Sequence, residues 1–271
     1  MHGDRAFAPH ARSTSPDPDR LERGERYWRA AQRLRDGALA PVLPFVLALG
    51  VTGSSAYREP EAGDDLDLLA ITRPGTLWIV LAYAYLALRF GRGPGPLGEP
   101  STVCLNYVRD APAALREFSQ AQDFLFAREA LTVRLLVGEA FYARLLASAP
   151  WMAREVPRLY GARRDPSGPQ RLPKTSLALR GLNALLFLGV STYLQLQGLR
   201  RNAHLRRRGA TDDVFRSVTR LGSLSFDSTR FERRRAGYAA PDVSPTPGGE
   251  GPRPADPSQA ARAPRSPAPG G

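Results

Sequence analysis

Two short apolar segments near the start of the chain place the strongest constraint on its fold. Residues 45–52 (FVLALGVT) and 65–72 (DLDLLAIT) are short for helices, and proline, glycine or aspartate bounds each of them. Such runs predict buried strands. Residues 102–108 (TVCLNYV) predict a third strand, while the apolar spacing of residues 21–39 and 76–90 predicts helices. The first part of the chain is therefore expected to build a small sheet flanked by helices.

Helical patterns dominate the rest of the chain, over residues 112–135, 139–148 and 174–202. Strands in one half and helices in the other predict an α+β fold, here a small mixed sheet with flanking helices followed by a helical C-terminal domain. The expected organisation is a flexible leader at residues 1–20, an α/β domain at 21–111, a helical domain at 112–240 and a disordered tail at 241–271.

The composition indicates a globular protein with a disordered end. Of the 271 residues, 42% are hydrophobic and 24% are charged, which is ordinary for a folded domain. No large apolar residue follows Val243, so the proline- and glycine-rich tail cannot bury enough surface to offset its chain entropy. The single cysteine, Cys104, excludes a disulfide framework and a multi-cysteine metal site. Its position in a predicted strand indicates a core residue rather than a nucleophile.

Two apolar segments approach the length of a membrane span. Residues 77–88 are too short to cross about 30 Å of hydrocarbon. Residues 181–198 are longer and uncharged, but one side of the segment carries a stripe of Leu182, Leu185, Leu186, Gly189, Tyr193 and Leu196. This stripe predicts a core helix of a soluble protein, and association of the segment with a membrane is the open alternative. We therefore expect a cytoplasmic protein without a membrane partner, since the first 20 residues also lack the apolar region of a secretory signal.

Familiar ligand-binding motifs are out of context or absent from the sequence. Residues 93–98 (GPGPLG) match the glycine pattern of dinucleotide-binding loops, but they follow a predicted helix, and their prolines remove backbone N–H donors. The only lysine, Lys174, follows a proline rather than a glycine, which excludes a P-loop. The three histidines have no metal-ligand spacing.

Asp65 and Asp67 form the pattern that carries most chemical information. Residues i and i+2 of a strand point to the same side, so the two carboxylates are expected to project together, with Cα atoms about 6.5–7 Å apart. Leu66 and Leu68 are expected to point the other way, into the core. Two carboxylates so placed suit Mg²⁺, which prefers hard oxygen ligands and binds phosphate oxygens. The pair alone is weak evidence, because an Asp-rich turn before a strand is common.

The residues upstream strengthen this interpretation. Gly53 and Ser54 leave the predicted strand at residues 45–52 and are expected to open a helix. Their backbone N–H groups and the Ser54 hydroxyl would then face the carboxylates, as donors that suit a triphosphate. The joint pattern of strand, Gly-Ser, short spacer, Asp-x-Asp and strand resembles the minimal signature of the DNA polymerase β-like nucleotidyltransferase superfamily.

Further segments extend this resemblance over most of residues 28–238. The runs DDLDLLAITRPGTLW, VCLNYV, QDFLFAREALTVRLLVGEAFYARLL and FDSTRFERRRAGY look like the prokaryotic nucleotidyltransferase domain-containing proteins. The resemblance implies transfer of a nucleoside monophosphate from a nucleoside triphosphate to an unidentified acceptor hydroxyl, with Mg²⁺ or Mn²⁺ as cofactor. It makes Asp65 and Asp67 the catalytic metal ligands, and Gly53 and Ser54 the triphosphate contacts.

The resemblance also implies a third carboxylate on a nearby strand, as a metal ligand and as the base for the attacking hydroxyl. The strand at residues 102–108 presents Asn106 there, and the next acid is Asp110. An amide oxygen coordinates metals but takes no proton. Either Asp110 or Asp64 supplies the third acid, or the chain is a weak or inactive member that acts as a nucleotide-, RNA- or protein-binding module.

The basic charge leaves two interpretations open. The chain carries a net charge of +12, and residues 200–235 hold eleven arginines against four acids. This segment is either a solvated helical face or an anion-binding wall for a triphosphate or an RNA. No feature indicates that bases are read specifically, so RNA is an open but not an indicated partner.

Overall fold

The computed structural model describes residues 18–57, 60, 64–90, 100, 102–165, 167, 171–209 and 215–228, all within one compact unit. The predicted leader up to residue 17, the glycine pattern at residues 93–98 and the predicted tail at residues 241–271 lie outside these ranges.

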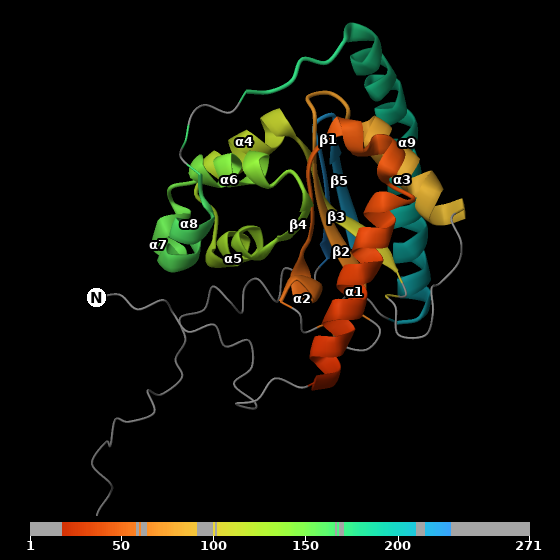
Figure 1. Ribbon diagram of the computed structural model, residues 1–271. Coiled ribbons are helices and arrows are strands. Elements are labelled where there is room, and N and C mark those ends of the chain that lie inside the picture. The colour runs from red at the N-terminus through yellow and green to blue at the C-terminus, as the bar shows by residue number, and fades with distance from the viewer. Residues whose placement is uncertain are drawn as a thin grey trace, which may run out of the picture. The chain divides into compact units, whose positions relative to one another are not determined.

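A mixed six-stranded sheet lies at the centre of this unit, in the strand order β4-β1-β2-β3-β6-β5 (Figure 1). The strands are β1 (Val46–Val51), β2 (Leu66–Thr72), β3 (Val103–Asp110), β4 (Arg134–Val137), β5 (Phe215–Arg220) and β6 (Ser223–Ser228). β2 and β3 run parallel, and the other neighbouring strands run antiparallel. A parallel pair needs a crossover connection, which contains helix α3 (Leu77–Phe90).

Helices cover both faces of the sheet (Figure 1). One face carries α4 (Ala111–Ser119), α5 (Phe124–Thr132), α6 (Glu139–Ala147), α7 (Met152–Glu155) and α8 (Pro157–Arg163); the other carries α1 (Pro18–Asp36), the 3-10 helix η1 (Ala40–Phe45), α3 and α9 (Leu177–Arg207). Strand alternation builds the two cores. Leu66, Leu68 and Ala70 of β2 pack on the α3 side, whereas Leu69 and Ile71 pack on the α4 side.

The α+β class predicted from the sequence is confirmed, and β1 to β3 coincide with the three predicted strands. The second part of the chain is mainly helical as predicted, although the segment predicted as a helix at residues 112–135 forms α4, α5 and the start of β4. It also contributes β4, β5 and β6 to the same sheet. β4 and β5 lie at the two edges, where a strand needs little apolar surface, and the β5 sequence FRSVTR has no apolar run to mark it. The domain boundary at residue 111 stays a prediction.

The core role predicted for residues 181–198 holds for only one side of helix α9. Leu182, Leu185 and Leu196 of the predicted core stripe are 45%, 68% and 50% exposed. Leu186 of the same stripe does pack on the α3 core, together with Phe187, Val190 and Leu194, which the stripe did not include. Buried Asn183 fixes this orientation, because its Oδ1 accepts the backbone N–H of Trp78 at 2.7 Å. That amide lies in the first turn of α3, where the helix itself offers no acceptor.

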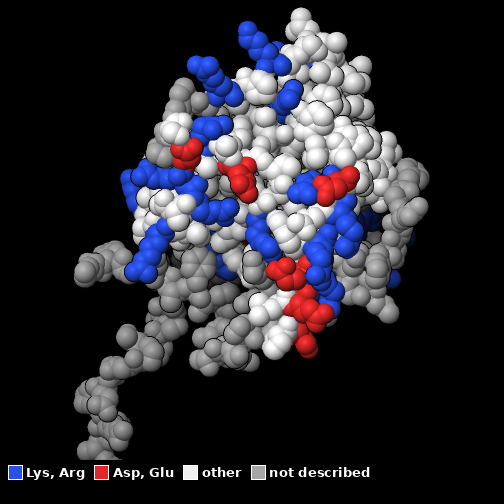
Figure 2. Space-filling model, in the orientation of Figure 1, with Lys and Arg blue, Asp and Glu red and all other residues white. Residues whose placement is uncertain are grey.

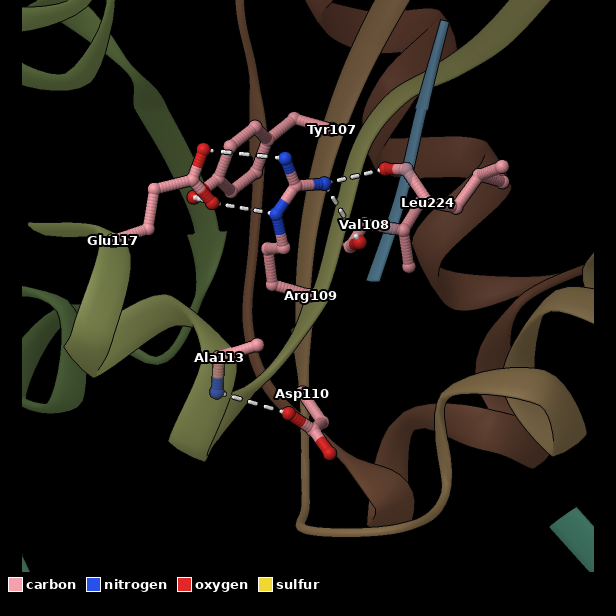
Figure 3. A network of polar contacts seen from close by, with 7 residues as sticks. All are labelled: Tyr107, Val108, Arg109, Asp110, Ala113, Glu117 and Leu224. Carbon is pink, nitrogen blue, oxygen red and sulfur yellow. Dashed lines mark hydrogen bonds and ion pairs between the residues drawn. The ribbon is translucent and has the colours of Figure 1, made fainter. Parts of the chain in front are cut away.

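Arg109 links three elements near the end of β3 (Figure 3). Its guanidinium donates to the two carboxylate oxygens of Glu117 in α4, at 2.6 and 3.2 Å, and to the backbone carbonyl oxygen of Leu224 in β6. It also lies 4.3 Å from the centroid of the Tyr107 ring. A buried guanidinium is stable only while it is paired, so this network joins β3, α4 and β6.

Glu117→Gln is expected to lower the free energy of unfolding by about 2–4 kcal/mol, because it leaves the buried guanidinium of Arg109 without its counter-charge. Denaturant unfolding followed by circular dichroism measures the loss. The matched control is Glu22→Gln, which breaks the exposed pair with Arg26 on α1 and is expected to cost about 0.5 kcal/mol or less. Equal losses in the two variants would contradict the role of the Arg109 network.

Candidate functional site

Asp67 of strand β2 lies in a cluster of acidic side chains. Leu66 and Leu68 are fully buried on the α3 side, so strand alternation directs Asp67 to the opposite side. Asp65, just before β2, is exposed, whereas Asp67 is partly buried. The charges of Asp65, Asp64 and Glu129 all act on the Asp67 carboxylate. These four acids are called the acidic cluster below.

Burial and neighbouring negative charges both raise the pKa of Asp67. Its pKa rises to about 7, first because burial penalises the charged form and then because of the negative charges of Asp65, Glu129 and Asp64. A hydrogen bond that Asn106 Nδ2 donates to Asp67 Oδ1 acts in the opposite direction. A divalent cation at this point would favour the charged carboxylate, as a nearby positive charge does in general.

The short helix α2 (Gly53–Ala56) follows β1 and lies against the acidic cluster. Gly53 has a φ of +65°, and a Cβ at this position would lie 2.9 Å from Asp67 Oδ2. Glycine tolerates both the conformation and the close approach. The Gly53 amide donates to Glu129 Oε2 at 3.3 Å, and Ser54 Oγ donates to Asp64 Oδ2 at 2.8 Å. Both predicted phosphate donors thus contact carboxylates, which a phosphate would have to replace.

Glu129 of α5 is the member of the acidic cluster that the sequence analysis missed. Besides the Gly53 amide, its carboxylate accepts the Tyr57 hydroxyl at 3.1 Å. The guanidinium of Arg128 lies 4.5 Å from the centroid of the Tyr57 ring, so it also contacts this tyrosine. Glu129 is the only acid in α5, whose sequence FLFAREALT is mainly apolar. A lone acid in such a helix is the signal that could have identified it.

Strand β3 places Asn106 and Cys104 beside the two aspartates. A bulge leaves Asn106 without a register partner on β2, and bulges commonly redirect a side chain. Cys104 lies opposite Asp67, and its thiol is 3.8 Å from Asp65 Oδ2. Burial, followed by the charges of Asp65 and Asp67, raises the pKa of this thiol to about 12. It therefore stays protonated at neutral pH, which argues against a nucleophilic role.

The two acids named as alternatives for the third carboxylate lie in different places. Asp64 belongs to the acidic cluster and accepts the Ser54 hydroxyl. Asp110 lies opposite Thr72, at the other end of the β2–β3 pair from Asp67. There its carboxylate caps α4 by accepting the Ala113 N–H at 3.0 Å (Figure 3). Asp110 is thus a capping residue, and the structure does not bring it to the acidic cluster.

The acidic cluster offers two carboxylates for a Mg²⁺ ion whose other ligands would come from a bound substrate. Within the described part of the chain, no group of three or more His, Cys, Asp or Glu side chains is arranged as a complete metal site. Mg²⁺ in nucleotide sites, however, is typically held by one or two carboxylates together with substrate phosphates. Asp65 and Asp67 are the two carboxylates that could hold such an ion, and a cation there would favour the charged form of Asp67, whose pKa is raised to about 7.

Comparison with protein-family models, with curated proteins and with solved structures found no match for the chain. The chemistry of the acidic cluster is therefore the basis on which a function is assigned.

Gly53→Ala is expected to lower the free energy of unfolding by about 2–3 kcal/mol, since the new Cβ adds a clash with Asp67 to the cost of a positive φ. Gly209→Ala is the matched control, because Gly209 has a φ of +73° with open space around its Cβ position. That variant is expected to cost about 1 kcal/mol. Denaturant unfolding compares the two, and equal losses would contradict the close approach of Gly53 to Asp67.

Asp67→Asn is expected to stabilise the metal-free protein by about 1–3 kcal/mol near pH 8, because it removes a poorly accommodated charge. The folded pKa of about 7 lies above the ordinary value of 3.8. The folded state therefore binds more protons between these values, and wild-type stability falls as the pH rises from about 4 to about 7. Thermal unfolding in EDTA across this window measures the effect. An advantage of the variant that persists at the acid end would contradict it.

Proposed function

We propose that this chain is a Mg²⁺-dependent nucleotidyltransferase of the DNA polymerase β-like superfamily. It would move a nucleoside monophosphate from a nucleoside triphosphate to an acceptor hydroxyl. The observation that carries the proposal is that the start of α2 lies against the Asp67 carboxylate. A Cβ built on Gly53 would be 2.9 Å from Asp67 Oδ2. The Gly-Ser turn and the Asp-x-Asp strand, separate in sequence, thus meet at one point of a mixed sheet.

Each residue of the site has a distinct role in this proposal. Asp65 and Asp67 would hold Mg²⁺, which neutralises phosphate charge and polarises the transferred group. The Gly53 amide and the Ser54 hydroxyl would contact the β- and γ-phosphates in place of Glu129 and Asp64. Glu129 is a positioning residue, because it holds the turn through Gly53 and Tyr57.

The proposed reaction balances with these groups. The acceptor oxygen forms a bond to the α-phosphorus, the bond from that phosphorus to the oxygen that bridges to the β-phosphate breaks, and pyrophosphate leaves. The hydroxyl proton passes to a carboxylate, for which Asp64 and Asp65 are the candidates, because the amide of Asn106 cannot take it. The protein contributes mainly positioning and charge neutralisation, as in phosphoryl transfer generally.

A nucleotide-, RNA- or protein-binding module is the second candidate function. Asn106 favours it, because an amide rather than a base lies beside Asp67 on the neighbouring strand. The arginines from Arg200 to Arg208 add positive charge at the C-terminal end of α9. That charge suits any anionic ligand, so it supports both candidates equally.

Calorimetric titration of the full chain with each nucleoside triphosphate, with and without Mg²⁺, tests the proposal. Asp65→Asn/Asp67→Asn is expected to abolish Mg²⁺-dependent binding while circular dichroism shows an intact fold. The control Glu22→Gln/Asp36→Asn removes two exposed charges from α1 and is expected to bind like the wild type. Pyrophosphate release on addition of hydroxyl acceptors supports the transferase, and binding without release favours the module. Absence of binding would contradict a nucleotide site.

A further inference from the structure

We propose that the outward face of α9 is a docking surface for an anionic lipid bilayer. This inference goes beyond the proposed nucleotide chemistry and does not depend on it. Six leucines on α9 each expose between 45% and 82% of their surface: Leu177, Leu182, Leu185, Leu188, Leu196 and Leu199. A single exposed leucine is ordinary in a soluble protein, but a continuous apolar surface marks an interaction site.

The leucines form a stripe along one side of the helix. Leu182, Leu185 and Leu188 follow each other at three-residue intervals, and exposed Gly189 and Thr192 continue the stripe toward Leu196 and Leu199. This spacing places them on one face, opposite the side that packs on α3. A Cβ built on Gly189 meets no atom within 4 Å. The face is therefore open where the structure describes it.

The stripe lies on the protein surface without crossing a bilayer. By length and composition α9 is apolar enough to span a membrane, and only 6% of its most apolar window is buried. The helix, however, is held to the rest of the fold by the Trp78–Phe187 ring contact at 5.1 Å and by the hydrogen bond from Gln195 to the Ser217 carbonyl at 3.1 Å. A helix fixed to a sheet in this way can lay one apolar face into the headgroup boundary.

The positive charge around the stripe favours an anionic binding partner. Residues 171–209 contain eight Lys and Arg residues and no Asp or Glu, and none of the eight lies between Arg180 and Arg200. In Figure 2 most of the surface at the upper right, around the first turns of α9, is accordingly uncharged. Both ends of the stripe are positive, so pairing with a second copy in either direction would oppose like charges. Anionic headgroups complement this pattern.

Two tyrosines lie beside the stripe, one on α3 and one on α9. Tyr85 of α3 and Tyr193 of α9 are 39% and 38% exposed. The rings of Tyr85 and Tyr193 lie edge to face with centroids 5.3 Å apart, and their hydroxyls share a hydrogen bond. An apolar ring with a polar tip suits the boundary between hydrocarbon and headgroups.

Vesicle flotation of the full 271-residue chain tests the docking surface. The probes are vesicles of phosphatidylcholine alone and of phosphatidylcholine mixed with phosphatidylglycerol, and binding is expected to the mixed vesicles. Leu185→Gln is expected to lower partitioning about tenfold, because the leucine no longer contributes apolar burial. Leu21→Gln, on the exposed surface of α1, is the matched control and is expected to leave partitioning unchanged.

A second pair of variants tests the charge. Arg206→Gln/Arg207→Gln is expected to lower partitioning into the mixed vesicles at least tenfold, and added salt is expected to lower it further. Arg116→Gln/Arg154→Gln removes the same charge from α4 and α7, on the other face of the sheet, and is expected to have no effect. Arg201 is not used, because its charge acts on Cys104 at the acidic cluster.

Two outcomes would overturn the proposal. One is absence of binding to the mixed vesicles, and the other is an equal loss of partitioning in the control variants. A dimer in light scattering that Leu185→Gln dissociates would assign the face to a second copy of the chain. Protein that leaves cell membranes only with detergent would indicate a spanning helix. None of these variants touches Asp65 or Asp67, so failure here leaves the nucleotide proposal to its own test.

Discussion

A carboxylate on a strand that is covered on both faces is the constraint around which the site is organised. Asp67 is the only ionisable residue of β2, and its neighbours Leu66 and Leu68 anchor it in the α3-side core. The strand therefore cannot turn this charge toward water without exposing its leucines. The bulge at Asn106 and the positive φ of Gly53 both bring polar groups to that fixed carboxylate.

These local features lower stability, and the remainder of the fold compensates for them. Crowded, partly buried carboxylates are unfavourable, and perturbed groups of this kind concentrate at functional sites. At the other end of β3 the polar groups are conventionally satisfied: Arg109 is paired with Glu117, and Asp110 caps α4. The two ends of one strand thus differ: the polar groups at the Arg109 end stabilise packing, whereas the carboxylates of the acidic cluster repel one another.

The strand predictions that depended on local sequence patterns were right, whereas the predictions that depended on contacts between distant residues were incomplete. β1 to β3 were predictable because continuous apolar runs are local signals, and the common side of Asp65 and Asp67 follows from strand alternation alone. Glu129 was missed because a helix distant in sequence brings it to the Gly53 amide. The inward side of α9 was predicted only in part, with Leu186 packed inward but Leu182, Leu185 and Leu196 exposed, for a similar reason. The helix has apolar residues all round, and one distant hydrogen bond, from Trp78 to Asn183, decides which side is buried.

That last error bears on how the two proposals relate to each other. A helix that is apolar all round has to cover two sides, and the sheet accounts for only one of them. Asp67 faces the α5 side of the sheet, whereas α9 packs on the other side, so the two proposals concern separate surfaces. Arg201, on α9, acts electrostatically on Cys104 beside Asp65. The two proposals can therefore be tested separately when Arg201 is left unchanged in the lipid-binding variants.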